Sequence, residues 1–332
     1  MRQRYQQNDT TDHDHASDRL GTVHGFKQCG EEQHSIQKLN GGPLILRMWA
    51  TIYRATPQLV KIPFTQVDIT FSLLSFLFLH IIRVITTPIM VNTFGWPANH
   101  KLTNEAVASV VSMFHAALLV PSLYVCLRTQ PYRPSAKFSE SPSWWNDAAK
   151  ALILLCNGYM IQDTLFGVFL ANYTPGHGIK ITSDQIPFIA HHVITVSYML
   201  STIVVEAGHI SAMILMFLGE FTNPMFNSYL MAVSTVNLDF CCGMSEALFQ
   251  PIAAINAFFY ILFRAIISPP FILHLGYDLI LTKEGRKNLP LPLSIYFFTC
   301  GLIVLYGSVP WIADAWGLLK DTFHGKSILY RL

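Results

Sequence analysis

Titratable side chains occur inside long apolar segments of this sequence, where charge is costly. Histidine accepts and donates a proton near neutral pH, and a neighbouring carboxylate can pair with it. Histidines and carboxylates occur in successive apolar runs, as Asp163, then His191 with His192, then Glu220. The next apolar run contains Arg264. A charge at the centre of a membrane-spanning helix costs about 2.5–3.5 kcal/mol on insertion scales. We therefore expect these side chains to face the interior of a helix bundle.

The spacing of these residues predicts a common depth. In a helical hairpin that turns at 206–208, His192 and Glu220 each lie about 14 residues from the turn, and so return to the same level at 1.5 Å per residue. Asp163 lies close to the end of the preceding apolar run. The sequence therefore predicts an intramembrane layer of Asp163, His191, His192 and Glu220 a few residues below one membrane surface.

Two polar residues extend the predicted layer. Thr195 is four residues after His191 and three after His192, so its hydroxyl can share a helix face with either ring. Asn223 lies three residues after Glu220 and brings an amide to the same layer. Both residues are therefore candidates for the site.

Arg264 lies deep in its apolar run and needs a partner, for which Asp163 and Glu220 are equal candidates. The other titratable residues in apolar runs are interpreted more simply. Arg83, one turn after His80, is expected to form a structural ion pair with a carboxylate or to reach a lipid phosphate. We expect His115 to be a buried core histidine, and Asp68 and Asp314 to lie at the membrane interface.

The predicted layer has three chemical interpretations. An acid–base or ligand-binding site and a buried polar network that locks the helices together are equally compatible with the residues. A zinc or iron site is a weaker option, because adjacent histidines point about 100° apart on a helix and make poor joint ligands. We therefore predict neither a metal nor a cofactor.

The elements that must position these residues are apolar helices. The 332-residue chain is 52% hydrophobic and 13% charged, about half the charged fraction of a typical soluble domain. Runs longer than about 20 apolar residues cross a bilayer, and in lipid they must be helical so that every backbone amide is paired. The sequence predicts an all-α, polytopic transmembrane helix bundle of about six or seven helices. The predicted runs are 64–91, 104–127, 148–171, 185–205, 209–236, 247–281 and 292–319.

Two proline sites interrupt this pattern. Pro224 falls within the fifth run, and Pro269–Pro270 are expected to kink or break the sixth. Around the bundle, residues 61–320, we expect a polar, disordered cytosolic tail at 1–60 and a short C-terminal tail at 321–332.

Charge and cysteine content restrict partners and topology. The net charge is +2 and no basic stripe suited to nucleic acid is visible, so we predict no nucleic-acid partner. Basic residues of the short loops gather mainly on the N-terminal side, which places the N-terminus in the cytosol. Cys241–Cys242 fall in a predicted loop, where we expect neither a disulfide nor a metal site.

The ordered set of polar residues resembles the TLC-domain family, named for TRAM, Lag and CLN homology. The run 191–195 is similar to the family's HHxxT motif, and Gly158-Tyr159 with Asp163 is similar to GYxxxD in the preceding helix. The run 219–227 resembles a motif of the small members once called transmembrane protein fifty-six, and Phe263-Arg264 resembles their next helix. The resemblance covers about 64–319.

The resemblance implies a protein of the endoplasmic reticulum, or of the plasma membrane, that is tied to lipid composition. Ceramide synthases of the family carry an HD-x-x-D cluster where this chain has 219–224, without the second acid, so we favour the non-synthase branch and a non-enzymatic role. We expect it to bind or sense lipid acyl chains, with membrane lipids as partners. The alternatives are an acyl-CoA-dependent N-acyltransferase related to ceramide synthase, and a transporter or trafficking receptor.

Overall fold

The computed structural model describes residues 42–98, 100–170, 172–174, 176, 178–183, 185–238 and 246–326. The predicted disorder of the first 41 residues and the predictions for Cys241–Cys242 lie outside this part. The described chain consists mainly of helices and their connecting loops, with one short antiparallel pair of strands, β1 (Tyr173–Thr174) and β2 (Gly178–Ile179). The all-α prediction is confirmed.

Within the described residues, six helices are long and apolar enough to cross a membrane. Several of them join α-helical and π-helical segments end to end. They are α3 (Thr70–Pro88) with η1 (Ile89–Thr93); α4 (Lys101–Arg128); α5 (Ser143–Gln162) with η3 (Asp163–Phe169); α6 (Gln185–Val204); α9 (Glu246–Tyr260) with η4 (Ile261–Ile267), α10 (Ser268–Gly276) and η5 (Tyr277–Leu281); and α12 (Leu291–Gly307) with α13 (Val309–Phe323).

A further traverse of the bundle is broken in the middle. It consists of α7 (His209–Glu220) and α8 (Asn223–Asn237), separated by Phe221 and Thr222. Pro224 lies in the first turn of α8, where its missing N–H has no intrahelical acceptor to lose. The interruption predicted at Pro224 is therefore present, and both halves pack along α4.

Of the kink or break expected at Pro269–Pro270, the break is absent, because the helix continues through both prolines. The π-helix η4 runs directly into α10, and the two prolines fall in the first turn of α10. A π-helical turn shifts the hydrogen-bond pattern by one residue, so the helix can continue across positions that lack an amide donor. The sixth apolar run is one continuous helix from Leu248 to Leu281.

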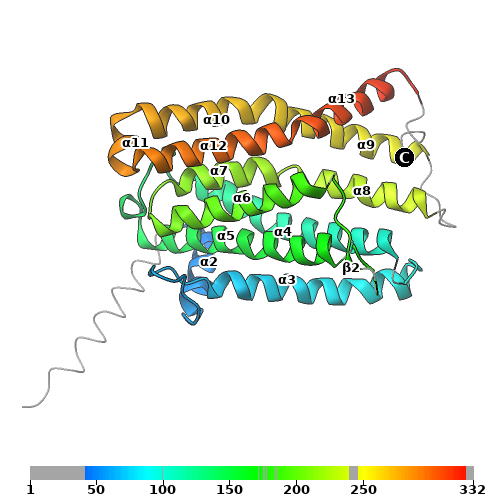
Figure 1. Cartoon of the computed structure of the whole chain (residues 1–332), viewed down its shortest axis with the longest axis horizontal. Coiled ribbons are helices and arrows are strands. Elements are labelled where there is room, and N and C mark those ends of the chain that lie inside the picture. Colours follow the sequence, from blue (N-terminus) through cyan, green and yellow to red (C-terminus); the bar gives the residue numbers. More distant parts are fainter. Residues whose placement is uncertain are drawn as a thin grey trace, which may run out of the picture. The chain divides into compact units, whose positions relative to one another are not determined.

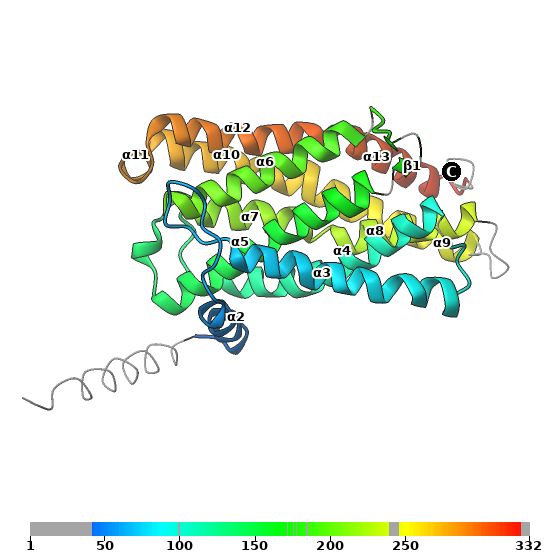
Figure 2. The same ribbon diagram turned by 60° about the horizontal axis from the view of Figure 1, so that its bottom comes forward.

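The helices lie side by side, with α10 and α12 on one flank, α6, α7 and α8 in the middle and α3, α4 and α5 on the other flank (Figures 1 and 2). The long hydrophobic side chains of α5 are the most deeply buried, and Leu152, Ile153 and Leu154 have no exposed surface. Gly158 of α5 lets α3 approach closely, because a Cβ there would meet the Phe76 nitrogen and the Ser75 Cβ, each at 2.8 Å. The core thus sits around α5.

The predicted N-terminal tail extends too far along the chain. Residues 44–55 form α2 (Leu44–Ala55), which runs across the bundle rather than along it (Figure 2). Its helical stripe of Leu46, Trp49 and Ala50 is buried, and the Trp49 indole donates to Ser122 Oγ at 2.9 Å. At the other end, α13 continues to Phe323, beyond the predicted boundary at residue 320.

Three connections meet at one end of the bundle. The Gly208 amide donates to the Ala136 carbonyl at 3.0 Å, and the Asn288 side chain donates to the Ser135 carbonyl at 3.2 Å. The last connection contains α11 (Lys283–Asn288). This end carries most of the basic loop residues on which the orientation rests. The assignment of this end to the cytosol stays a prediction.

Candidate functional site

A cavity of about 270 Å³ lies inside the bundle, between the middle layer and its neighbours. Helices α4 to α8 line most of it, and α9, η4, α12 and α13 close the remaining side. All seven residues predicted for the site line this cavity: Asp163, His191, His192, Thr195, Glu220, Asn223 and Arg264. Their sequence positions span a hundred residues, so the fold gathers them.

His192 makes polar contacts at both nitrogens of its ring. Its Nδ1 lies 2.8 Å from Thr164 Oγ1, and the Thr164 hydroxyl donates to the Met160 carbonyl at 2.7 Å. In the contact with Thr164, Nδ1 donates or accepts according to the tautomer of the ring. Nε2 lies 3.8 Å from Asp163 Oδ2. The imidazole ring therefore lies between a hydroxyl group and a carboxyl group.

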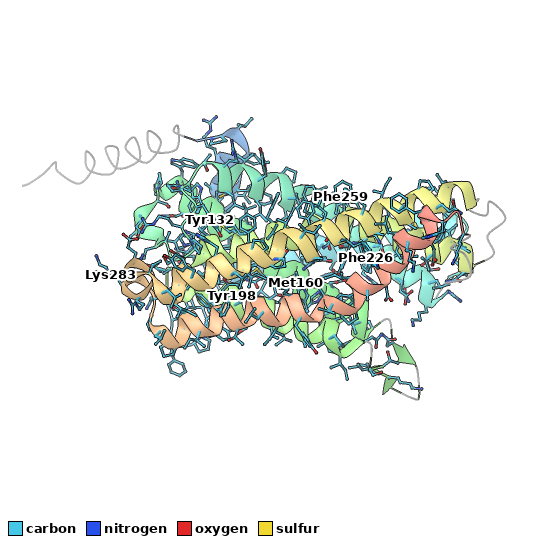
Figure 3. All side chains as sticks on the ribbon, turned by 90° about the horizontal axis from the view of Figure 1, so that it is seen from above. Tyr132, Met160, Tyr198, Phe226, Phe259 and Lys283 are labelled. Atoms are coloured by element: carbon cyan, nitrogen blue, oxygen red, sulfur yellow. The ribbon has the colours of Figure 1, made fainter. Side chains whose placement is uncertain are left out.

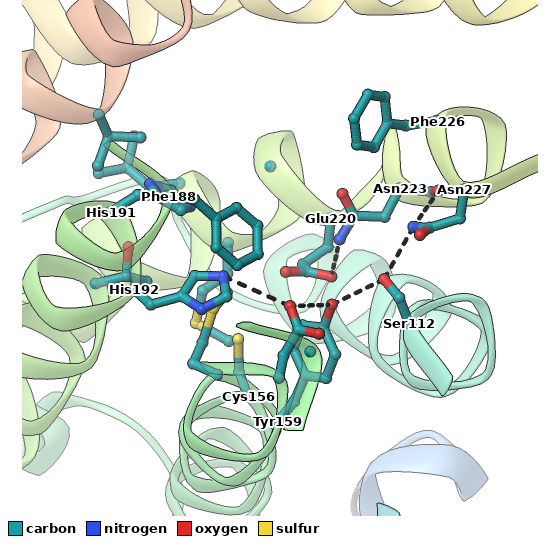
Figure 4. Close-up of a pocket in the computed structure, with 18 of the residues that line it drawn as sticks. Ser112, Cys156, Tyr159, Phe188, His191, His192, Glu220, Asn223, Phe226 and Asn227 are labelled. Atoms are coloured by element: carbon teal, nitrogen blue, oxygen red, sulfur yellow. Dashed lines mark hydrogen bonds and ion pairs between the residues drawn. The ribbon is translucent and has the colours of Figure 1, made fainter. Parts of the chain in front are cut away.

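Asp163 opens the π-helix η3 and touches a second hydrogen-bonded group. The Tyr159 hydroxyl lies 2.8 Å from Ser112 Oγ and 3.5 Å from Asp163 Oδ2. The Asn227 amide also donates to Ser112 Oγ, at 2.9 Å. This chain joins α4, α5 and α8 through buried polar atoms (Figure 4).

Glu220 ends α7 and is almost fully buried. One of its carboxylate oxygens, Oε2, accepts a hydrogen bond from the Asn223 amide at 2.8 Å and lies 3.3 Å from His115 Nδ1. The His115 ring stacks on the Tyr159 ring with centroids 4.0 Å apart. Glu220 thus connects to the Tyr159 chain through His115.

His115 therefore has a different role from the isolated core histidine that the sequence suggested. It is fully buried beside Glu220, and it shares a helix face with Ser112, three residues earlier. Ser112 and His115, three residues apart in the second apolar run, form a polar pair that the sequence analysis did not use. Thr164, next to Asp163, was also missed, because its partner His192 lies on another helix.

Arg264 does not form the predicted ion pair with Asp163 or Glu220. Its Nη2 donates to the Gly219 carbonyl at 3.3 Å, and its guanidinium lies 5.8 Å from the centre of the Tyr260 ring. Gly219 has no side chain, so the guanidinium can reach the backbone of α7. Within the described chain, Arg264 Nε is buried without a hydrogen-bond partner. The arginine therefore keeps donor capacity beside the cavity.

His191 and Thr195 line the cavity without joining the Asp163 or Glu220 contacts. The His191 and His192 rings are 5.7 Å apart at a 49° angle, as adjacent positions on a helix require. Among the described residues, no three His, Cys, Asp or Glu side chains gather as a metal site would need. The site is a set of hydrogen-bonding and titratable groups around a partly apolar space.

The architecture and the cavity define a class, a multi-pass helical membrane protein with a polar site buried among its helices. The family model of the TLC domain matches residues 105–313, more than half of the chain, and the chain belongs to this family. The matched region begins at Glu105 in α4, includes every residue of the predicted site and leaves out α2 and α3. No curated protein matches the chain.

Proposed function

We propose that this protein binds a membrane lipid in the cavity and acts in membrane lipid homeostasis without catalysis. The observation that carries the proposal is the division of the cavity wall. Its polar groups gather where Asp163, His192 and Glu220 approach one another, while other parts of the wall are apolar side chains such as Met160, Phe188, Ile194 and Leu215. A site of this kind is complementary to an amphiphile, with apolar walls for a chain and a few placed polar groups for its polar end.

The charges inside the cavity favour a particular kind of polar end. The cavity lining contains the carboxyl groups of Asp163 and Glu220 and one guanidinium group, that of Arg264. The lining also contains Glu105 at the start of α4, whose carboxylate is paired with the Lys101 ammonium group at 3.6 Å. The interior thus holds more carboxyl groups than fixed cations. We infer that the bound lipid presents hydrogen-bond donors, as hydroxyl or amino groups, to Asp163 and Glu220.

Lipid retention by the purified full-length chain tests this proposal. Protein extracted in mild detergent and measured by native mass spectrometry should carry at least one lipid per chain. His192→Ala and Asp163→Asn should reduce that occupancy several-fold, since each removes one polar contact from a buried site. His324→Ala, at the exposed end of α13, is the matched control and should retain lipid normally.

A cellular measurement complements the binding experiment. Lipidomes of cells that lack the protein should be restored by the wild-type chain and not by His192→Ala. If the purified protein carries no lipid, or if His192→Ala restores the wild-type lipidome, the cavity is a packing feature and the proposal fails.

The position of the His192 ring beside Asp163 favours one second candidate, N-acyl transfer from an acyl-CoA. His192 Nε2 would take the proton from an acceptor amine as the nitrogen bonds to the acyl carbon. The thioester C–S bond would break, and the proton would leave with the CoA thiolate. Against this candidate, no second acid follows Glu220 as in the synthase motif.

Membranes supplied with a labelled acyl-CoA and a long-chain amine separate the two candidates. Amide formation by the wild type that is lost in His192→Ala would establish the transferase. Absence of product in membranes whose purified protein still retains lipid would establish the binding protein.

A further inference from the structure

A second hollow of the bundle opens on the outer surface between α4, α7 and α10. It has a volume of about 560 Å³ and is lined almost entirely by apolar and aromatic side chains. Tyr132 marks its position, toward the end of the bundle where Lys283 lies (Figure 3). We call it the α4–α7–α10 groove, lined by Tyr124, Leu127, Arg128, Gln130, Pro131, Tyr132, Ile210, Ile214, Phe217, Leu218, Phe263, Ile267 and Phe271.

The groove is separate from the polar cavity. The two share no lining residue, because α7 presents opposite faces to them. Ile214 and Leu218 form the floor of the groove and are only 7% and 5% exposed, while Leu215 and Gly219 face the cavity. In the same way, Phe263 lines the groove and its neighbour Arg264 lines the cavity.

Aromatic rings form the walls of the groove. The rings of Tyr132 and Phe271 meet edge to face with centroids 5.7 Å apart, and the rings of Tyr124 and Phe217 lie 6.4 Å apart. Tyr124 and Tyr132 are 54% and 41% exposed. The groove floor is thus closed, and its side is open toward the lipid that surrounds the spans.

The end of the groove is polar and cationic. Arg128 is the last residue of α4 and the end of a membrane span, so its guanidinium lies where lipid headgroups begin. Arg128 has no ion-pair partner among the described residues, unlike Arg133, which contacts Glu140 at 3.0 Å. Burial and the nearby Asp278 raise the pKa of Tyr132 to about 12, so its hydroxyl remains a donor. Gln130 adds an amide.

We propose that the α4–α7–α10 groove binds a glycerophospholipid, with its phosphate on Arg128 and one acyl chain between α7 and α10. An unpaired guanidinium with two further donors is complementary to a phosphate ester. Below it, the lining runs from Ile210 to Leu218 on α7 and from Phe271 to Phe263 on the facing helix, about 12 Å at 1.5 Å per residue. Charge at one end and an apolar channel beneath it match the two ends of this ligand.

The test uses full-length protein in mild detergent and native mass spectrometry, with dioleoyl phosphatidylglycerol as the probe. Dioleoylglycerol, which has the same chains and no phosphate, is the matched ligand. Wild-type protein should bind phosphatidylglycerol at least fivefold more tightly than dioleoylglycerol. Arg128→Gln should remove this preference while leaving dioleoylglycerol binding unchanged.

Two further variants locate the binding. Ile214→Trp fills the groove and should weaken binding of both lipids, whereas Arg133→Gln, outside the groove, should behave as the wild type. His192→Ala should leave the effect intact, because it alters only the polar cavity. Wild-type preference for phosphatidylglycerol in Arg128→Gln, or equal binding of the two lipids by the wild type, overturns the proposal.

Discussion

At the scale of single residues, the contact between Thr164 and His192 determines which ring nitrogen faces Asp163. Thr164→Val removes the hydroxyl group that contacts Nδ1 and releases the ring from this position. One buried hydrogen bond contributes about 0.5–1.5 kcal/mol, so we expect lipid occupancy in native mass spectrometry to fall roughly two- to tenfold. Thr87→Val is the control, because Thr87 lies outside the cavity. Its hydroxyl donates to the backbone carbonyl four residues earlier, as the Thr164 hydroxyl does. Equal losses in both variants would contradict the assignment.

The Tyr159 hydroxyl connects three helices through Ser112 and Asn227. Tyr159→Phe removes one donor and leaves the ring in its stack on His115. We expect the free energy of unfolding to fall by about 1 kcal/mol, so that the melting temperature in detergent falls by a few degrees. Tyr306→Phe should not change the melting temperature, because Tyr306 is 80% exposed. A Tyr159→Phe protein as stable as the wild type would show that the chain of polar contacts does not support the bundle.

Residue contacts within the site are predictable from the sequence only in part. Helical period and the hairpin turn bring His192 and Glu220 to similar depths, but they do not tell which atoms meet. Glu220 contacts His115 of α4, and Arg264 contacts the Gly219 carbonyl, because the rotation of each helix about its axis decides these pairs. That rotation depends on packing between helices, which cannot be predicted from a single sequence.

At the scale of elements, the contact between α3 and α5 depends on Gly158. Gly158→Ala would bring a methyl group against the Phe76 nitrogen and the Ser75 Cβ, and neither the backbone nor a Cβ can rotate away. We expect a loss of about 1–3 kcal/mol, measured as a lower melting temperature. Gly307→Ala is the matched control, because no atom lies within 4 Å of a Cβ at the end of α12. A stable Gly158→Ala protein would mean that α3 can shift outward without cost.

The apolar runs predicted the spans closely because hydrophobic length is a local property. The same reasoning missed α2, whose short amphipathic stripe is below the length needed to cross a bilayer. It also expected Pro269–Pro270 to disturb the helix, although η4 provides a turn that accommodates them. Local composition therefore predicts where helices lie better than how they continue or dock.

At the scale of the whole molecule, the basic loops predict that the end carrying Lys283 faces the cytosol. In a chain whose Cys29, Cys241 and Cys242 are replaced by serine, Lys283→Cys should react with an impermeant maleimide on sealed microsomes. Lys180→Cys, at the opposite end, should react only after permeabilisation. Cys126, Cys156 and Cys300 are buried and serve as an unreactive background. The reverse labelling pattern would invert the orientation.

The position of α7 has a consequence for regulation. One face of this helix borders the polar cavity and the other borders the α4–α7–α10 groove, so α7 is one of the walls that the two compartments share. If filling one compartment displaces this wall, the affinity of the other changes, and thermodynamic reciprocity requires the same factor in both directions. The break at Phe221–Thr222 ends this helix within the bundle, two residues before α8 begins. The lipid composition of one leaflet would then be communicated to a site buried among the helices by a movement of α7 alone.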